Sequence, residues 1–598
     1  MKNHTSIPEA LRKLRHLNFP ADASLGWLDV RNSMGQNEFS CENSAGIDRS
    51  GPSWHRLGQA RSTVTIPPGM AVRLRLNQGA AADLSPLSHF GQDDIQVLDC
   101  STRPVTDAQL VYLAGFSGLQ SLNLWNTHVS GTGMQHLQPL QSLRCLAFVP
   151  ALQPFNPVSQ PEPGDNDLSF LQGLHNLTRL YLSARRLAGT GLKHLQNLSR
   201  LRRLHLVNMS VFSTEGWHTL GRLRPLWTLD LGGSFTSDDD LRYLSELAHI
   251  QDLNLSHTRL AGRGLAHLGS LLSLRSLVLD WNHIQEKELR HLTSLSRLET
   301  LSFSENQIGE EGLTFIARLP NLRKLNLSAY GTGLYASINL HGFHMLGRIK
   351  TLRSLDLSGS DIDQDGLASL STLNGLVKLG LENTGVTDSA SEALAALVRL
   401  RSLNLRGTDL SDDGLVRLKD LAALRELQLA DTLVTGTSLV SLRRFKKLRI
   451  LSLGGRIAFL PSSLVEFENL KELAELSLYG EGINDEACHH LSLLRGLRKL
   501  SFYFSQISSV GLAELKGLSG LESLVIYQAP VSDAGLSSLA QLPLLAELDI
   551  RETRVSDAGI DHLKALQGLE KLYLHNTQIT PQGIAELRAA LPNCTFDS

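Results

Sequence analysis

Few residues in this 598-residue chain have the types and spacing that catalysis or metal binding requires. Cys488, His489 and His490 form the densest group of potential metal ligands, and His341 and His344 are the next pair. Cys488 takes the place of a core leucine in its helix, so we interpret it as a buried thiol beside two surface histidines. The sequence has no GxxxxGK, GxSxG, HExxH or CxxC motif. We therefore expect no catalytic site, no metal and no cofactor.

Aromatic residues at strand positions that face outward are stronger candidates for a functional surface. Tyr479, Tyr503 and Tyr527 recur every 24 residues, each directly after a Leu-x-Leu, Leu-x-Phe or Leu-x-Ile pattern. Side chains alternate along a strand, so the aliphatic residues face the core and the tyrosines face out. Aromatic residues are enriched at binding hot spots. The predicted partner-binding residues are Tyr479, Tyr503, Phe504, Tyr527, Tyr573 and His575, with a thinner second set of Trp125, Tyr181 and His205.

These candidates belong to a repeated unit of about 24 residues, LxxLxLxxTxVTDxGLxxLxxLxx. The stretch from Leu274 to Asn282, for example, recurs from Leu298 to Asn306. Twenty such units start between Ile95 and Leu569. In each unit LxxLxL has the period of a strand and GLxxLxxL that of a helix, with Ser or Thr before Asp as the helix N-cap. The repeat predicts a strand, a tight loop and a helix in every unit.

Parallel strands stack about 4.8 Å apart, whereas helices need about 10 Å. An array of such units must therefore curve, with strands on the concave side and helices on the convex side. This α/β solenoid resembles the leucine-rich repeat superfamily, specifically its bacterial and ribonuclease-inhibitor-like class. The resemblance covers residues 95–598 and implies recognition of a protein on the concave face.

Two other recurring residues have structural explanations. The Thr or Asn at the ninth position of the unit, such as Thr258 or Asn282, is expected to turn inward and bind loop backbone. The Asp of the VTD motif is explained by capping of the helix that follows it. Neither residue therefore indicates catalysis.

The residues before the first repeat predict an N-terminal segment with a structure of its own. We expect 1–60 to be poorly structured except for one possible helix over Pro8–Leu17, and 61–94 to form a cap. That cap would contain a hairpin over 63–76 and a helix over 80–90, sealing the first repeat. Within the repeat domain of 95–598, loop insertions are predicted near 149–167 and 329–345.

Composition restricts the partner and the location. Lys and Arg number 57 against 59 Asp and Glu, which gives a net charge of −2 and disfavours nucleic acid. There is no apolar run long enough to cross a membrane and no apolar secretory signal at the N-terminus. Five scattered cysteines are expected to be reduced thiols. We expect a cytoplasmic, monomeric protein.

These features favour a non-catalytic scaffold that binds a protein on its concave face. A second hypothesis is a substrate-recognition subunit or effector in ubiquitin-type protein turnover, because Ile7–Leu14 resembles the opening of an F-box. A third is an enzyme whose site lies in the N-terminal segment or the insertions. That segment is short and lacks a catalytic constellation, so the scaffold is the preferred hypothesis.

Overall fold

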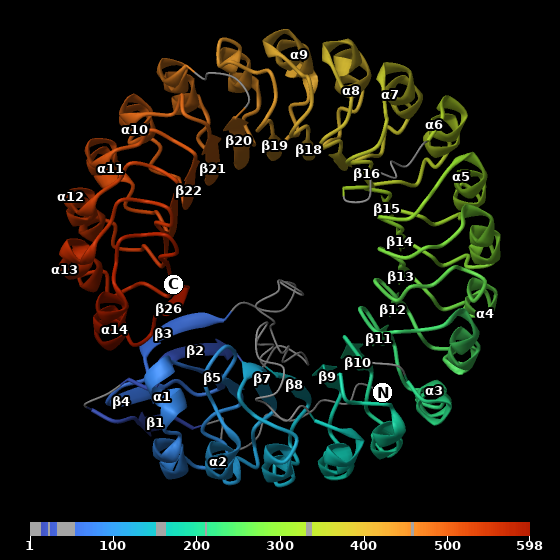
Figure 1. Ribbon diagram of the computed structural model, residues 1–598, viewed down its shortest axis with the longest axis vertical. Coiled ribbons are helices and arrows are strands. Elements are labelled where there is room, and N and C mark those ends of the chain that lie inside the picture. The colour runs from blue at the N-terminus through green and yellow to red at the C-terminus, as the bar shows by residue number, and fades with distance from the viewer. Residues whose placement is uncertain are drawn as a thin grey trace. The chain divides into compact units, whose positions relative to one another are not determined.

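The computed structural model describes residues 13–21, 24–32, 54–150, 163–183, 185–209, 212–330, 338–455 and 460–597. The chain divides into two compact units, residues 1–282 and 283–598. Within each unit, short strands line the inner side of a curved array and helices line its outer side (Figure 1). This is the α/β leucine-rich-repeat solenoid that the sequence predicts.

The first unit begins with antiparallel strands and continues as a parallel sheet. β1 pairs with β4, and β2 pairs with both β3 and β5. From β5 onward each strand pairs in parallel with the next. The strands are β1 (Arg15–Asn18), β2 (Gly26–Asn32), β3 (His55–Gln59), β4 (Thr63–Ile66), β5 (Met70–Leu76), β6 (Val97–Asp99), β7 (Ser121–Thr127), β8 (Cys145–Pro150), β9 (Arg179–Ser183), β10 (Arg203–Val207), β11 (Thr228–Asp230), β12 (Asp252–Asn254) and β13 (Ser276–Val278). The helices are α1 (Gln78–Ala82), η2 (Ser85–His89), α2 (Asp107–Leu110), η3 (Val111–Leu113), η4 (Gly133–Leu137), η5 (Asp165–Gly173), η6 (Thr190–Leu195), α3 (Thr214–Gly221), η7 (Asp238–Glu246), α4 (Leu265–Leu268) and η8 (Glu286–Leu292), the last of which lies in the second unit.

The N-terminal segment differs from the sequence expectation. Residues 15–18 form β1 rather than part of a helix, and Leu17 is buried between exposed neighbours, as the two-residue period of a strand requires. β4 and β5 are both strands, but β4 pairs with β1 and β5 with β2, so they are not partners in a hairpin. The helix expected over 80–90 is two short helices, α1 and η2. Residues 1–12 and 33–53 lie outside the described residues.

The second unit is a parallel sheet in which repeat leucines pair in register. Leu500, for example, lies between Leu476 and Leu524 on the neighbouring strands. The strands are β14 (Thr300–Ser302), β15 (Lys324–Asn326), β16 (Ser354–Asp356), β17 (Lys378–Gly380), β18 (Ser402–Asn404), β19 (Glu426–Gln428), β20 (Ile450–Gly454), β21 (Glu475–Tyr479), β22 (Lys499–Tyr503), β23 (Ser523–Tyr527), β24 (Glu547–Asp549), β25 (Lys571–Tyr573) and β26 (Thr595–Asp597). The helices are α5 (Glu310–Ile316), α6 (Leu340–Gly347), α7 (Gln364–Leu370), η9 (Asp388–Ala390), α8 (Ser391–Ala395), α9 (Asp412–Arg417), η10 (Leu418–Asp420), η11 (Leu439–Arg444), η12 (Pro461–Asn469), α10 (Asp485–Leu491), α11 (Ser509–Glu514), η13 (Leu515–Gly517), α12 (Asp533–Leu536), η14 (Ser537–Gln541), η15 (Asp557–Gly559), α13 (Ile560–Lys564) and α14 (Pro581–Ala590).

Polar side chains hold the tight turn that follows each strand. Thr258 is buried, and its hydroxyl donates to the carbonyl of Leu255 at 2.6 Å. In the next repeat the Asn282 amide donates to the carbonyls of Leu255 and Leu279, and its oxygen accepts from the Leu260 N–H at 2.9 Å. The inward orientation predicted for the ninth position is therefore confirmed at these residues.

The aspartate of the VTD motif has a role beyond the expected helix capping. Ser556 is the N-cap of its own helix. The carboxylate of Asp533, one repeat earlier, accepts from the N–H of Ser556 at 2.8 Å and from its hydroxyl at 2.7 Å. Asp485 contacts Ser508 in the same way. At these repeats the motif therefore joins one helix to the turn of the following repeat.

The cysteine predictions are partly correct. Cys488 is fully buried, and this burial raises the pKa of its thiol. Cys100, Cys488 and Cys594 are free thiols, but Cys145 is disulfide-bonded, so the expectation that every cysteine is reduced is wrong.

The predictions about metal sites, membrane spans and loop insertions can be compared with the described residues only. Among these residues no group of three or more His, Cys, Asp or Glu side chains could hold a metal ion. No helix in the described ranges is long and apolar enough to cross a membrane. Within the two predicted insertions, residues 151–162 and 331–337 lie outside the description.

Candidate functional site

Three tyrosines form a continuous column on the concave face of the second unit. Tyr479, Tyr503 and Tyr527 end β21, β22 and β23 and are paired in register. The rings of Tyr479 and Tyr503 stack with centroids 4.7 Å apart and an interplanar angle of 16°. The rings of Tyr503 and Tyr527 are 6.3 Å apart and tilted by 50°. The aliphatic neighbours Leu478 and Ile526 are fully buried, so the tyrosine column is the half-exposed face of the same strands.

Phe504 lies beside this column in an unusual backbone conformation. Its ring meets that of Tyr527 edge to face at 5.4 Å, and 49% of the residue is exposed. Its φ is 56°, in the left-handed region that disfavours bulky side chains. The same turn position holds Asn383 and Asn576, residues that tolerate this conformation. Phe504 is thus an exposed apolar residue in a left-handed turn conformation that asparagine adopts with less strain.

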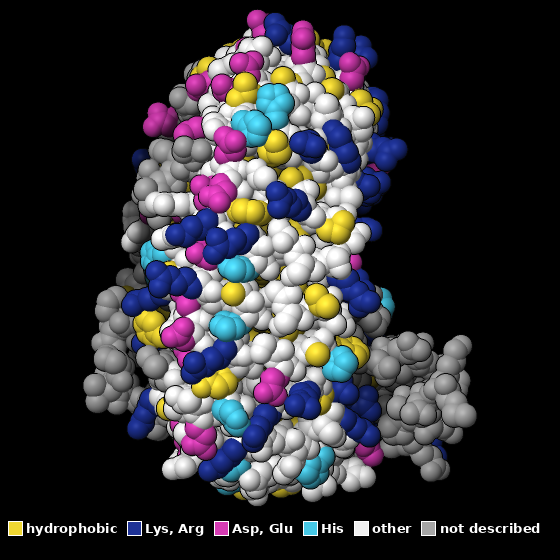
Figure 2. Space-filling view, turned by 90° about the vertical axis from the view of Figure 1, so that its right-hand side faces the viewer, with side chains coloured by type: hydrophobic (Ala, Val, Ile, Leu, Met, Phe, Trp, Pro, Cys, Tyr) yellow, Lys and Arg dark blue, Asp and Glu magenta, His cyan; other side chains and the backbone are white. Residues whose placement is uncertain are grey.

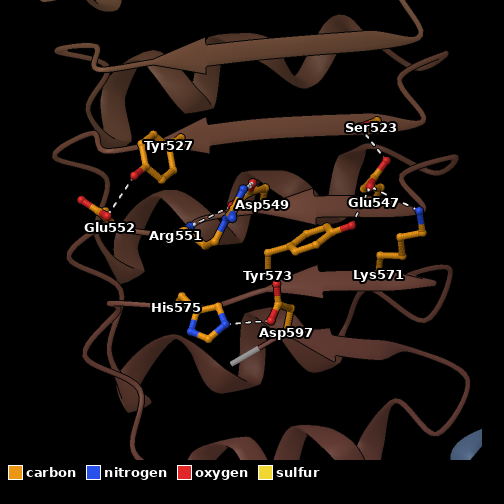
Figure 3. A network of polar contacts seen from close by, with 10 residues as sticks. All are labelled: Ser523, Tyr527, Glu547, Asp549, Arg551, Glu552, Lys571, Tyr573, His575 and Asp597. Carbon is orange, nitrogen blue, oxygen red and sulfur yellow. Dashed lines mark hydrogen bonds and ion pairs between the residues drawn. The ribbon is translucent and has the colours of Figure 1, made fainter. Parts of the chain in front are cut away.

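Arg551 occupies the next repeat of the column and is fixed from three sides. Its guanidinium lies 5.5 Å from the ring centroid of Tyr527 and 5.3 Å from that of Tyr573. It also donates to both carboxylate oxygens of Asp549, at distances from 2.6 to 3.1 Å (Figure 3). Asp549 is buried. Arginine is thereby held in one orientation between two aromatic rings.

The tyrosine hydroxyls are also positioned by carboxylates (Figure 3). The hydroxyl of Tyr527 donates to Glu552 at 2.9 Å, and this bond, followed by burial, raises the pKa of Tyr527. The hydroxyl of Tyr573 donates to Glu547 at 3.2 Å. Burial and then Glu547 raise the pKa of Tyr573 to about 12. These phenols therefore remain protonated donors at neutral pH.

Charged residues border the column on both sides. Lys499 pairs with Glu475 at 3.0 Å, and Lys571 with Glu547 at 3.6 Å. His575 contacts Asp597 at 2.7 Å through Nε2. Tyr573 therefore meets the column through Arg551, whereas His575 contacts Asp597 of β26.

Arg406 is a member that sequence reasoning missed. Arg406 lies three repeats before Tyr479 along the chain, yet its guanidinium is 5.2 Å from the ring centroid of Tyr479. The guanidinium of Arg406 also forms an ion pair with the carboxylate of Asp431 at 3.0 Å. At the equivalent positions of the two repeats between Arg406 and Tyr479 stand Ala430, which follows β19, and Gly454, which ends β20, and these small residues are the signal in the sequence. The ring contacts of Arg551 depend on its side-chain conformation, so the strand pattern alone does not predict them.

The second predicted set, in the first unit, is less continuous. Tyr181 and His205 stack with centroids 4.2 Å apart, and Nδ1 of His205 contacts Asp230 at 3.2 Å. Trp125 lies two strands away on β7 and is not part of that stack. The structure thus brings together Tyr181 and His205 but leaves Trp125 separate.

Comparisons with known proteins concern the repeat. A family model described as "Leucine Rich repeat" matches residues 289–317, 349–371 and 400–419. No curated protein matches the chain. Among solved structures, an internalin (inlF) from Listeria monocytogenes is 21% identical, with 60% of this chain and 86% of that chain covered and a TM-score of 0.39.

Two further solved structures are similar over more of the chain. A plant peptide hormone receptor, RGFR1, in complex with RGF2 is 17% identical, covers 84% of this chain and 86% of its own, and has a TM-score of 0.34. A leucine-rich-repeat protein from Leptospira interrogans is 19% identical over 72% of this chain and 92% of its own, with a TM-score of 0.31. All three TM-scores are low, so the assignment depends on the repeat itself. The repeated motif, the in-register leucine strands and the three segments matched by the family model together support a leucine-rich-repeat solenoid.

Proposed function

We propose that this chain is a non-catalytic scaffold that binds a protein partner on the concave face of its second unit. The observation that carries the proposal is the tyrosine column, in which three half-exposed phenol rings are stacked in register. Arg551 is fixed against the last of these rings. Rigid tyrosine and arginine side chains lose little conformational entropy on binding and are typical of interface hot spots.

The charge of this face favours a protein over a nucleic acid. The outward positions of β14–β26 and the residues that directly extend them hold seven carboxylates and six Lys or Arg residues. The carboxylates are Asp356, Glu382, Glu426, Glu475, Glu547, Asp549 and Asp597, and the cations are Lys324, Lys378, Arg406, Lys499, Arg551 and Lys571. A phosphate backbone requires a basic excess, which this near-balance does not supply.

The outer side offers a weaker candidate surface. On the face shown in Figure 2, yellow hydrophobic side chains are scattered among charged and histidine side chains. Singly exposed apolar residues are normal on protein surfaces. Most of the segment that resembles an F-box opening, residues 7–12, lies outside the described residues, and residues 15–18, which follow it, form a strand.

Substitution within the column tests this function. We expect the double variant Tyr503→Ala, Tyr527→Ala to weaken binding of the partner, captured from native lysate with the wild-type chain, by about 2 kcal/mol or more. Tyr112→Ala, which removes an exposed tyrosine from η3 in the first unit, is the matched control and should bind normally. Unchanged binding by a folded double variant, seen by circular dichroism and calorimetry, would refute the proposed site.

A further inference from the structure

A cavity of about 490 Å³ opens beside the tyrosine column, at the turns that follow β21–β25. Phe504, Gln528 and Glu552 occupy the same turn position in consecutive repeats, with φ values of 54–57°. Because the turn geometry repeats, these side chains stand in a row along the cavity. Glu481 and Gln506 also line the cavity. The Tyr527–Glu552 hydrogen bond connects the cavity to the column.

The lining of the cavity combines an aromatic ring with oxygen acceptors. Phe504 is half exposed, so its ring can contact a ligand while it also contacts the ring of Tyr527. Within the described residues, neither Glu481 nor Glu552 has a cationic partner. Glu552 accepts from the Tyr527 hydroxyl at 2.9 Å and from the Asn576 amide at 3.5 Å. The side-chain amides of Gln506, Gln528 and Asn576 provide further acceptor oxygens.

One positive group also lines this cavity. Arg554 lies three repeats after Glu481 along the chain and forms no ion pair with either carboxylate in the part of the chain described here. Two carboxylates and one guanidinium leave a net charge of −1. The cavity therefore attracts a cation rather than an anion, and the aromatic ring favours a planar one.

We propose that this cavity binds an arginine side chain of the protein partner, with its guanidinium on the Phe504 ring and its N–H groups toward Glu481 and Glu552. The guanidinium has five donors in a plane, which suits a pocket that offers carboxylate and amide oxygens around an aromatic face. The inference specifies the partner chemistry of the proposed function. It predicts that the segment lying across the tyrosine column presents an arginine at the edge of the sheet.

Short peptides test the cavity without the partner. We would titrate the full chain with acetyl-Gly-Arg-Gly-amide and with the same peptide containing citrulline, a neutral isostere of arginine, and follow binding by ligand-observed NMR. The arginine peptide should bind about tenfold more tightly, since citrulline lacks the positive charge and therefore both the ion pairing and the cation–π attraction. Equal binding of the two peptides, no binding of either, or tighter binding of acetyl-Gly-Glu-Gly-amide at Arg554 would overturn the inference.

Variants assign that preference to the cavity. Glu481→Gln removes an exposed, unbonded carboxylate, so it should fold normally and lose most of the preference for arginine, as should Phe504→Ala. Glu311→Gln on α5, also exposed, is the matched control and should retain it. A preference that survives both Glu481→Gln and Phe504→Ala would contradict the assignment.

A second control separates this inference from the proposed function. Tyr503 does not line the cavity. Tyr503→Ala should therefore keep the arginine preference even though it weakens the partner complex. If the partner bound elsewhere, the peptide result would still stand. If the peptide preference were absent, the column could still bind its partner.

Discussion

At the scale of single residues, the candidate surface includes a side chain that its own backbone conformation disfavours. Phe504 is the clearest case, since it combines a left-handed backbone with an exposed apolar ring. Asn126, Asn208, Asn383 and Asn576 hold the same turn in other repeats without that penalty. Folding alone would favour asparagine at this position.

Phe504→Asn should therefore stabilise the second unit by about 1 kcal/mol, because asparagine adopts the left-handed conformation more readily. The same substitution should weaken partner binding. Urea unfolding followed by circular dichroism measures the first effect. A loss of stability would show instead that the ring contact with Tyr527 outweighs the backbone penalty.

At the scale of elements, hydrogen bonds between consecutive turns supplement the leucine core. Asp412, at the start of α9, accepts from Thr435, Thr437 and Ser438 of the next repeat at 2.5–3.2 Å. Burial acts to raise the pKa of Asp412, but these hydrogen bonds lower it more. A carboxylate with a lowered folded-state pKa stabilises the fold above its unfolded pKa of about 3.9 and loses that effect as pH falls through the folded value.

Asp412→Asn should lower the free energy of unfolding by about 1–3 kcal/mol at neutral pH, because charged acceptors form the stronger bonds. The difference from wild type should shrink below pH 4, where the wild-type carboxylate becomes protonated. Asp413→Asn, which replaces an exposed neighbour on the same helix, is the control and should change stability little. Equal effects of the two substitutions at neutral pH would refute the bridging role of Asp412.

The sequence predicted the elements of the repeats well and the N-terminal segment poorly. Repeated leucines specify which side of each strand is buried, so the positions of Tyr479, Tyr503 and Tyr527 followed from the pattern. Residues 15–18 belong to no repeat, and their pairing with β4 depends on a contact 45 or more residues away. The approach of Arg406 to Tyr479 depends on side-chain reach, which the strand pattern does not encode.

At the scale of the whole molecule, each repeat contacts mainly its neighbours, so damage should remain local. Leu403 is fully buried on β18 within the second unit. Leu403→Ala should cost about 2–5 kcal/mol and divide unfolding into more than one stage. Differential scanning calorimetry would detect the added transition.

Deleting 591–598 should loosen only the last repeats, and a single cooperative loss of the entire fold after that deletion would contradict a one-dimensional array.

The central claim, that a protein partner covers the tyrosine column, is tested most directly by hydroxyl-radical footprinting of the complex. Aromatic side chains that a partner covers should be oxidised more slowly than in the free chain. We expect protection of Tyr479, Tyr503, Phe504 and Tyr527, with unchanged oxidation of the exposed aromatic residues Tyr112 and Trp227 in the first unit. Protection confined to residues outside the column, with Phe504 and the three tyrosines oxidised as in the free chain, would contradict the account.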